Sequence, residues 1–301
     1  MISKNKPVKL NGKKVFPVWS GSRLSKLYDR FHDSHPVGEV WETSIEDGYE
    51  ATVLHSDGEI TFTEYLNELG APNPPLIKLL DSATPLSIQV HPDEDSARKF
   101  CGVSKNEMWY ILSAEADSSI LYGIKSCVEN GAIDTAIDDG SIDKIMNRVQ
   151  VKAGDVYMLP SGMLHSLGGG ITVLEVQNKA GTTYRVKDIC SNRDVHKVQA
   201  KGSYKNYSKA DAEAFLVDST IDDHLPIPGK IIARNKDFSV TIYKTEENSS
   251  IVHTQIAGVY MFCENGSGEV DGVSFATGES LYLPSPEEIR LAKNSSLIFV
   301  I

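Results

Sequence analysis

The feature that most constrains this chain is a short stretch of sequence that occurs twice. Residues 154–161, GDVYMLPS, correspond position by position to residues 278–285, GESLYLPS. Upstream of each copy lies an apolar, strand-like segment that ends in an acidic residue, Glu115 in the first case and Glu264 in the second. Self-similarity of this kind indicates two units with one architecture.

The polar stretch over residues 200–214 is the predicted junction between the two units. It divides the chain into a first unit over residues 1–200 and a second unit over residues 201–301. The alternative is that this stretch forms a surface helix within one continuous domain. A chain of 301 residues can bury either one large core or two modest ones.

Short apolar segments, bounded by clusters of Gly, Pro, Asn and Asp, predict strands along most of the chain. They span residues 76–80, 86–90, 108–112, 156–159, 171–176, 184–186, 239–243, 259–262, 280–283 and 297–300. Many short strands with such punctuation are typical of an all-β sandwich or barrel. We therefore predict a mainly β fold.

Helical signals are fewer. Apolar residues recur at helical spacing within residues 62–69, and Gly70 follows as a C-terminal stop. A second helical stretch, near residues 126–149, is interrupted by Gly140 and predicts two short helices inserted between strands. The prolines of residues 72–75 predict a loop, because proline cannot donate a ladder hydrogen bond.

Composition excludes several classes of protein. The formal net charge of −11 argues against nucleic-acid binding, since no basic field exists to attract phosphate backbones. No apolar run approaches the roughly 20 residues that span a bilayer, and no apolar stretch follows the N-terminal lysines as in a secretory signal. The four cysteines are scattered without a C-x-x-C pair, which favours free thiols in a reducing compartment. We expect a cytoplasmic protein that does not bind membranes.

Residues 86–92, LSIQVHP, alternate in polarity as a half-buried strand does. The aliphatic residues are expected to pack in the core, which puts Ser87, Gln89 and His91 on the opposite face. That face either lines a polar pocket inside a barrel or simply faces solvent. Glu107, at the mouth of the next apolar strand, is likewise either an exposed charge at the rim or a ligand.

A sharper signal is the spacing Gly154-x5-Pro160-x-Gly162-x2-His165, which resembles the second cupin signature without a gap. Gly154 makes the entry turn to a strand, and the segment from Pro160 to Gly162 bends the chain back. His165 then begins the return strand with its imidazole facing inward. This position favours a metal ligand over an ordinary core or surface histidine.

His91, Glu107 and His165 together offer two imidazoles and a carboxylate, with Gln89 as a candidate neutral fourth ligand. Such a set suits Zn²⁺ in a catalytic site that leaves a position for substrate or water. It also suits Fe²⁺, Mn²⁺ or Co²⁺, because ligand identity alone does not fix the metal. The other histidines lie in polar or turn-rich contexts and are expected at the surface: His32, His35, His55, His196, His224 and His253.

The second copy of the repeat lacks the corresponding ligand. When Pro284 is aligned with Pro160, Ile289 stands in place of His165, and Pro286 stands in place of a glycine. The second unit is therefore predicted to bind no metal by this route and to serve as a structural or dimerising unit.

Five motifs carry a resemblance to a known family. They are GEVWE at residues 38–42, PLSIQVHPD at 85–93, KNEMW at 105–109, PSGMLH at 160–165 and TTYRV at 182–186. In this order they resemble the motifs of type I mannose-6-phosphate isomerases of the short bacterial kind, which belong to the cupin superfamily. The resemblance covers most of the chain and is densest in its first two thirds.

This resemblance implies two cupin (jelly-roll) barrels with short helical insertions. It also implies a metal-dependent enzyme that interconverts mannose 6-phosphate and fructose 6-phosphate. On the same grounds His91, Glu107 and His165 would hold zinc. Gln89 would lie on the metal or near it, and Arg185 would be catalytic.

That reaction moves a proton between C1 and C2 through an enediol. A divalent ion can polarise the two oxygens, and a fixed guanidinium can stabilise their charge further, which is the role assigned to Arg185. Thr183, Arg185 and Lys187 are expected on one strand face, and Lys105 is expected to contact substrate oxygens. Glu175 is a candidate general base, or alternatively a structural carboxylate paired with a lysine or arginine.

The expected partner is one small sugar phosphate, with Ser161 and Lys78 as further candidates near its phosphate or the pocket wall. We expect a monomer or a homodimer.

The chain departs from the family motifs at Ser20 (W-G-G), at Asn106 (K-T-E) and after Asp188. These departures keep open a diverged paralogue or a non-catalytic, sugar-sensing cupin. A cupin oxygenase that uses Fe²⁺ is a further alternative, although its usual histidine-rich ligand set fits less well.

Overall fold

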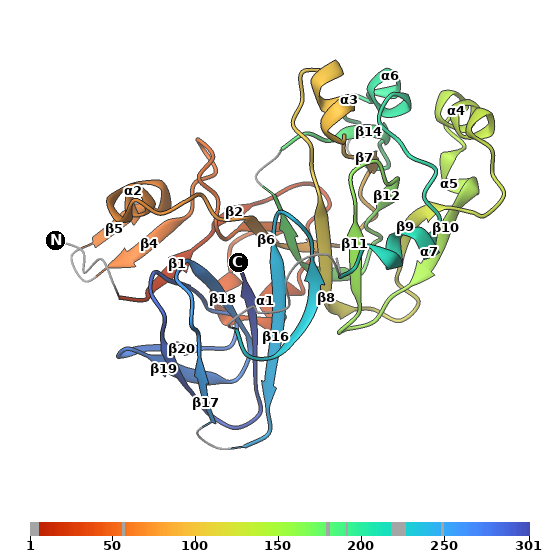
Figure 1. Ribbon diagram of the computed structural model, residues 1–301. Coiled ribbons are helices and arrows are strands. Elements are labelled where there is room, and N and C mark those ends of the chain that lie inside the picture. The colour runs from red at the N-terminus through yellow and green to blue at the C-terminus, as the bar shows by residue number, and fades with distance from the viewer. Residues whose placement is uncertain (1–5, 56–57, 179–180, 191, 218–226, 248–249) are drawn as a thin grey trace.

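The computed structural model describes residues 6–55, 58–178, 181–190, 192–217, 227–247 and 250–301 (Figure 1). Among the described residues, strands account for 39% and helices for 16%, so the predicted mainly β fold is confirmed. Within the described ranges the strands form four antiparallel sheets.

The two larger sheets are given in the order in which their strands pair. The eight-stranded sheet runs β15 (Lys230–Arg234), β16 (Ser239–Thr245), β23 (Ser295–Val300), β18 (Val259–Asn265), β21 (Ser280–Leu283), β1 (Val8–Asn11), β4 (Thr52–His55) and β5 (Gly58–Thr61). The six-stranded sheet runs β11 (Val156–Leu159), β8 (Glu107–Ala114), β13 (Ile171–Gln177), β6 (Leu76–Ser82), β3 (Glu39–Trp41) and β2 (Lys13–Val15).

Two smaller sheets and several short helices complete the fold. The five-stranded sheet runs β10 (Met146–Gln150), β9 (Ser119–Ile124), β12 (His165–Ser166), β7 (Ile88–Val90) and β14 (Tyr184–Lys187). The four-stranded sheet runs β17 (Ser250–His253), β22 (Glu288–Leu291), β19 (Ser267–Val270) and β20 (Val273–Ala276). The helices are α1 (Leu24–Leu27), η1 (Asp29–Phe31), α2 (Phe62–Leu69), α3 (Glu94–Lys99), α4 (Asn130–Asp139), α5 (Ile142–Ile145), α6 (Lys197–Lys201) and α7 (Lys209–Ala214). Among the described residues, none of these helices has the length and apolar character needed to cross a membrane.

The order of strand pairing recurs in the two halves of the chain. The order β11-β8-β13-β6 corresponds to β21-β18-β23-β16, and β10-β9-β12-β7 corresponds to β20-β19-β22-β17. The two copies of the repeated sequence form β11 and β21, and each pairs with the apolar strand that precedes it, β8 or β18. The sequence repeat therefore has a counterpart in the sheets, and two barrels remain our interpretation of it.

Strand pairing does not follow the division predicted at residue 200. β1, β4 and β5, from the N-terminal end, extend the eight-stranded sheet, with Val8 opposite Tyr282. Figure 1 shows β1 beside the blue C-terminal strands, and β4 pairs with β1 on its other edge. Residue 200 itself falls within α6, where Ala200 packs among apolar residues of the five-stranded sheet. The division of the chain into two domains therefore stays a prediction.

The helix predicted over residues 62–69 is confirmed as α2. Its N-terminus is a capping box, in which Thr61 Oγ1 accepts a hydrogen bond from Glu64 N and the Glu64 carboxylate accepts one from Thr61 N. Gly70 ends the helix with φ of 66°, a conformation that glycine adopts without steric cost.

The insertion predicted near residues 126–149 consists of α4 and α5, which Gly140 separates. The prediction extended the helical stretch too far, because residues 146–150 form β10 and pair with β9. Buried residues of α4, including Ile133 and Ile137, belong to the same apolar cluster as aliphatic residues of β7 and β14. These helices therefore cover one face of the five-stranded sheet, which directs the polar side chains of β7 and β14 to the other face.

A buried ion pair joins the N-terminal segment to the eight-stranded sheet. Arg30 bonds the fully buried carboxylate of Glu42 and also donates to Ser280 Oγ at 2.9 Å. Ser280 in turn lies 2.8 Å from the hydroxyl of Tyr260. Burial raises the pKa of Glu42, although the nearby guanidinium works in the opposite direction. Arg30 thus offsets part of the cost of burying this carboxylate.

Replacement of Arg30 by methionine is expected to destabilise the fold by about 3 kcal/mol near pH 7, because Glu42 then lies buried without a partner. Because the pKa of Glu42 is raised on folding, the folded state binds more protons than the unfolded state at pH values between the ordinary and the raised pKa. The loss should therefore shrink as the pH falls toward about 5. Urea unfolding at both pH values measures the effect, with Arg290→Ala, an exposed arginine, as the control. Equal losses in the free energy of unfolding for the two variants would contradict the assignment of Arg30 as the residue that stabilises buried Glu42.

Candidate metal centre and adjoining cavity

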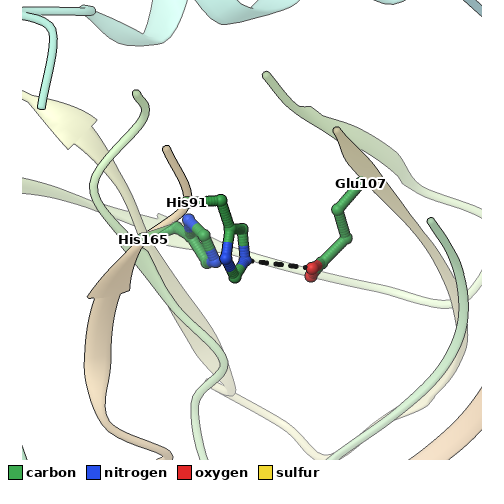
Figure 2. Close-up of side chains that lie close together, drawn as sticks. All are labelled: His91, Glu107 and His165. Carbon is green, nitrogen blue, oxygen red and sulfur yellow. Dashed lines mark ion pairs between the residues drawn. The ribbon is translucent and has the colours of Figure 1, made fainter. Parts of the chain in front are cut away.

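Three candidate ligands meet between the five-stranded and six-stranded sheets. His91 directly follows β7, Glu107 opens β8 and His165 opens β12. All three side chains are buried, and one donor atom from each lies within 4.8 Å of the others. Figure 2 shows the two imidazoles and the carboxylate close together. The structure therefore brings together the three residues that the sequence singled out as metal ligands.

Backbone carbonyls fix the orientation of both imidazoles. His91 Nδ1 lies 3.0 Å from the carbonyl oxygen of Thr182, and His165 Nδ1 lies 2.9 Å from that of Met163. A carbonyl can only accept, so each Nδ1 carries the proton and donates. Each Nε2 then presents its lone pair to the cluster, which is how histidines are oriented when they bind metal ions.

The protonation states at this cluster suit metal binding. Burial opposes ionisation of Glu107, but Lys105, whose Nζ lies 2.6 Å from Glu107 Oε2, holds the pKa of the carboxyl well below its usual range. Burial, followed by the neighbouring His91, lowers the pKa of His165 to about 3. Burial also lowers the pKa of His91. Near neutral pH the cluster therefore holds two neutral imidazoles and one carboxylate.

The converging atoms fit a divalent metal ion. His91 Nε2, which carries no proton, faces the buried Glu107 Oε2 at 3.1 Å (Figure 2), and apart from the ion pair with Lys105 the Glu107 oxygens make no hydrogen bond of good geometry within the described part of the chain. Buried polar atoms normally have a hydrogen-bonding partner, so lone pairs that face one another with no hydrogen between them indicate a position for a bound cation. Two imidazoles and a carboxylate suit zinc, and they also suit other divalent ions. The donor set thus supports a metal site without selecting the metal.

Gln89 lies beside this cluster. Its Nε2 atom is 3.2 Å from His165 Nε2, and the strand register places Gln89 opposite both His165 and Arg185. The Gln89 side chain also lines the adjoining cavity. Its role as a fourth ligand stays a prediction.

A cavity of about 220 Å³ adjoins the cluster, and Gln89 and Lys105 belong to its lining. The other charged residues that line it are Lys78, Arg185, Arg193, Glu39, Glu46 and Glu175. Four cationic side chains at one cavity are notable in a chain whose net charge is −11. This local concentration favours an anionic ligand.

Arg185 reaches this cavity from β14, as the strand alternation predicted. Its neighbours Tyr184 and Val186 are buried in the apolar cluster on the other face of the sheet. Lys187 was expected on the same face as Arg185, and this expectation was wrong. A bulge between Arg185 and Lys187 shifts the register, and Lys187 instead pairs with Asp143 at 2.7 Å.

His196 was expected at the surface, but it is half-buried and holds the backbone of Arg185. Arg185 N donates to His196 Nδ1 at 3.2 Å, and His196 N donates to the Arg185 carbonyl at 2.7 Å. Both backbone groups of Arg185 lie on the outer edge of β14, the last strand of its sheet. His196 therefore completes the hydrogen bonding of this edge, a contact that no local sequence pattern indicates.

Glu175 has properties that bear on both roles considered for it. It is buried, it lines the cavity, and its carboxylate accepts a hydrogen bond from Trp109 Nε1 at 3.0 Å. Lys78 Nζ lies 3.9 Å away. Burial, followed by the charge of Glu107, raises the pKa of Glu175 to about 7. A carboxyl with this pKa can both accept and release a proton near neutrality.

The structure distinguishes between Lys78 and Ser161, the two further candidates for the phosphate site or the pocket wall. Lys78 lines the cavity, where its ammonium lies 3.6 Å from the centre of the Trp41 ring. Ser161 does not line this cavity and instead donates to Asn106 Oδ1. Arg193 lines the cavity and pairs with Asp188 at 2.9 Å, yet no motif or spacing in the sequence indicated it.

The second copy of the recurring strand order, from β15 to β23 (the second unit), carries apolar residues at the positions that correspond to the ligands. Leu159 pairs with Glu107 in the first unit, and its counterpart Leu283 pairs with Val259. Ile289, the counterpart of His165, is fully buried in the apolar core of the second unit. Among the residues that the structure describes, no cluster of three metal-binding side chains occurs in this unit.

Comparison with known proteins finds mannose-6-phosphate isomerases with similar sequences. The chain is 33% identical over 185 residues to a mannose-6-phosphate isomerase of Streptococcus mutans, and 39% identical over 185 residues to the mannose-6-phosphate isomerase ManA of Bacillus subtilis. Each alignment spans 57% of this chain and 57% of the relative. No protein-family model matches the chain.

A solved structure extends the likeness to the whole chain. The crystal structure of the mannose 6-phosphate isomerase from Bacillus subtilis superposes with a TM-score of 0.81 at 25% identity, covering 98% of this chain and 99% of that one. Over its whole length the chain is therefore similar to a solved mannose 6-phosphate isomerase. This likeness agrees with the mainly β fold and with the buried cluster of His91, Glu107 and His165.

The metal cluster yields a direct prediction about binding. His165→Ala should weaken binding of Zn²⁺ or Co²⁺ by more than about 100-fold, because loss of a ligand should exceed the 10- to 100-fold cost typical of outer-shell changes. Competition with a chromogenic chelator measures the affinity. His253→Ala, which removes an exposed histidine of the second unit, is the matched control and should bind as the unaltered protein does. Equal affinities for both variants would rule out this site.

Proposed function

We propose that this protein is a metal-dependent isomerase that interconverts mannose 6-phosphate and fructose 6-phosphate. The observation that carries the proposal is the cavity with four cationic side chains beside a buried pair of imidazoles and a carboxylate. The names of the relatives support the choice of substrate. The cytoplasmic location and a monomeric or homodimeric state are part of the proposal.

The cavity suits a sugar phosphate. Its cationic residues, Lys78, Lys105, Arg185 and Arg193, offer charge-assisted hydrogen bonds to a phosphate, and its carboxylates and Gln89 offer partners for sugar hydroxyls. Trp19 and Trp41 add apolar surface to the wall. Few polar groups placed against aromatic walls are typical of specific small-molecule sites.

His91, Glu107 and His165, with Gln89 as a fourth candidate, would hold the ion. A bound divalent cation such as Zn²⁺ would supply Lewis acidity toward the oxygens on C1 and C2 of the sugar. Lys105 is buried and paired with Glu107, so it both balances the carboxylate and reaches the cavity.

Glu175 is the residue to which we assign proton transfer. In the forward direction its carboxylate takes the proton from C2 of mannose 6-phosphate and returns it to C1, while the hydroxyl proton on O2 moves to O1. Lys78 and Trp109, which contact the Glu175 carboxylate, hold it in place. Its raised pKa matches an operating pH near neutrality.

Arg185 is assigned to stabilisation of the charge on the enediol oxygens. Its Nε atom is buried and makes no hydrogen bond within the described ranges, so it is free to donate to a ligand. Burial, followed by the charge of Arg193, lowers the pKa of Arg185, and a bound anion would offset both effects. A guanidinium nevertheless stays protonated at neutral pH.

The proposal predicts turnover of mannose 6-phosphate in a coupled assay that detects fructose 6-phosphate. Chelation should abolish the activity, added Zn²⁺ should restore it, and Arg185→Ala should lower kcat by about 100- to 1000-fold through loss of charge stabilisation. Arg148→Ala, outside the cavity, is the control and should keep full activity. A folded, metal-loaded protein that shows no turnover would overturn the substrate assignment and favour a non-catalytic cupin.

A second prediction separates the two roles of Glu175. Glu175→Gln keeps the shape of the side chain and removes the base, so kcat should fall by about 100- to 10000-fold while KM changes little. Exchange of the C2 proton of mannose 6-phosphate with deuterated water, followed by nuclear magnetic resonance, should cease. A variant with lowered thermal stability but less than tenfold loss of kcat would instead assign Glu175 a structural role.

A further inference from the structure

Asn106 joins two of the segments that carry the metal cluster. It stands between Lys105 and Glu107, at the position where the family motif has threonine. Its Oδ1 atom accepts hydrogen bonds from both Ser161 N, at 3.1 Å, and Ser161 Oγ, at 3.2 Å. Asn106 N donates to Asn178 Oδ1 at 2.8 Å. The side-chain amide thus ties the start of β8 to the turn between β11 and β12, while the backbone N–H of Asn106 binds Asn178, which directly follows β13.

The same turn also holds the other two ligands. Gly162 N donates to the carbonyl oxygen of His91 at 2.7 Å. Three residues later the chain reaches His165, whose imidazole is bonded to the carbonyl of Met163. A displacement of this turn would therefore alter the positions of His91 and His165 relative to Glu107.

The second unit supplies one further partner to this network. Asp237 lies in the turn between β15 and β16, and Asn106 Nδ2 donates to Asp237 Oδ2 at 2.6 Å. A carboxylate only accepts, so it fixes the amide with its nitrogen toward Asp237 and its oxygen toward Ser161. The turn that carries Asp237 is itself ordered, because Asn235 Oδ1 accepts hydrogen bonds from Asp237 N at 2.7 Å and Phe238 N at 3.0 Å.

We propose that Asp237 is a positioning residue for the metal site, acting across the two units through Asn106. The proposal rests on the proposed metal dependence of the protein. It gives the second unit, which has no ligand cluster among its described residues, a direct role in the geometry of the first. It also accounts for asparagine at position 106, because threonine has no amide with which to join Asp237 and Ser161 at once.

The test measures metal affinity, so it does not depend on turnover. The metal-free full chain is titrated with Co²⁺, and the visible absorption of the bound ion reports both its affinity and its coordination geometry. Asp237→Ala should weaken binding about tenfold, the lower limit for outer-shell partners of a metal site, and should change the spectrum. Asp237→Asn keeps an acceptor for the Asn106 amide, so its affinity should stay within about threefold of the unaltered protein.

Two further variants test whether the change in Co²⁺ affinity arises from loss of the Asp237 carboxylate and whether it requires the side chain of Asn106. Lys236→Ala changes the same turn but removes only an exposed ion pair with Glu94, and it should leave the affinity and the spectrum unchanged. In an Asn106→Thr background, Asp237→Ala should have no additional effect, because the connecting amide is already gone.

The outcomes separate this proposal from the proposed function. If the unaltered chain binds no Co²⁺, the metal-dependent function fails and this proposal fails with it. If the unaltered chain binds Co²⁺ and Asp237→Ala binds it equally well with the same spectrum, this proposal alone is wrong. An effect of Asp237→Ala that persists in the Asn106→Thr background would also overturn it, because the action would not pass through the amide.

Discussion

Burial of the Glu107 carboxylate is the constraint on which the rest of the site depends. A buried carboxylate is costly unless charges and hydrogen bonds surround it, and here the charge comes from Lys105 at 2.6 Å. Its two oxygens and the Nε2 atom of His91 still make no hydrogen bond of good geometry within the described part of the chain. Lys105 thus balances the charge of the cluster, while the lone pairs of His91 Nε2 and Glu107 stay available to a divalent cation.

The sheets explain how this cluster is kept in place. The helices on one face of the five-stranded sheet bury the aliphatic side chains of β7 and β14, so the alternating polar side chains, among them Gln89 and Arg185, face the six-stranded sheet. The second unit repeats the strand order with Val259 and Ile289 at the corresponding ligand positions. One framework can therefore carry either a polar site or an ordinary apolar core, depending on a few residues.

Much of this arrangement could be predicted from local patterns. Period-two alternation placed Gln89 and Arg185 on the correct faces, and the spacing of glycine and proline before His165 located the return strand. The contacts that could not be predicted join segments distant in the sequence. His196 completes the edge of β14 beside Arg185, and Asp237 reaches Asn106 from another sheet. Neither contact has a local signature, and a bulge such as the one before Lys187 depends on partner strands.

Anomalous X-ray diffraction from crystals of the Zn²⁺-loaded protein, collected on both sides of the zinc absorption edge, tests the central claim most directly. The account predicts one strong peak per chain, about 2.0 to 2.2 Å from His91 Nε2, His165 Nε2 and a carboxylate oxygen of Glu107. It predicts no comparable peak near Ile289. A peak located elsewhere, or none at this cluster in fully loaded crystals, would contradict the assignment of the metal centre and the mechanism built on it.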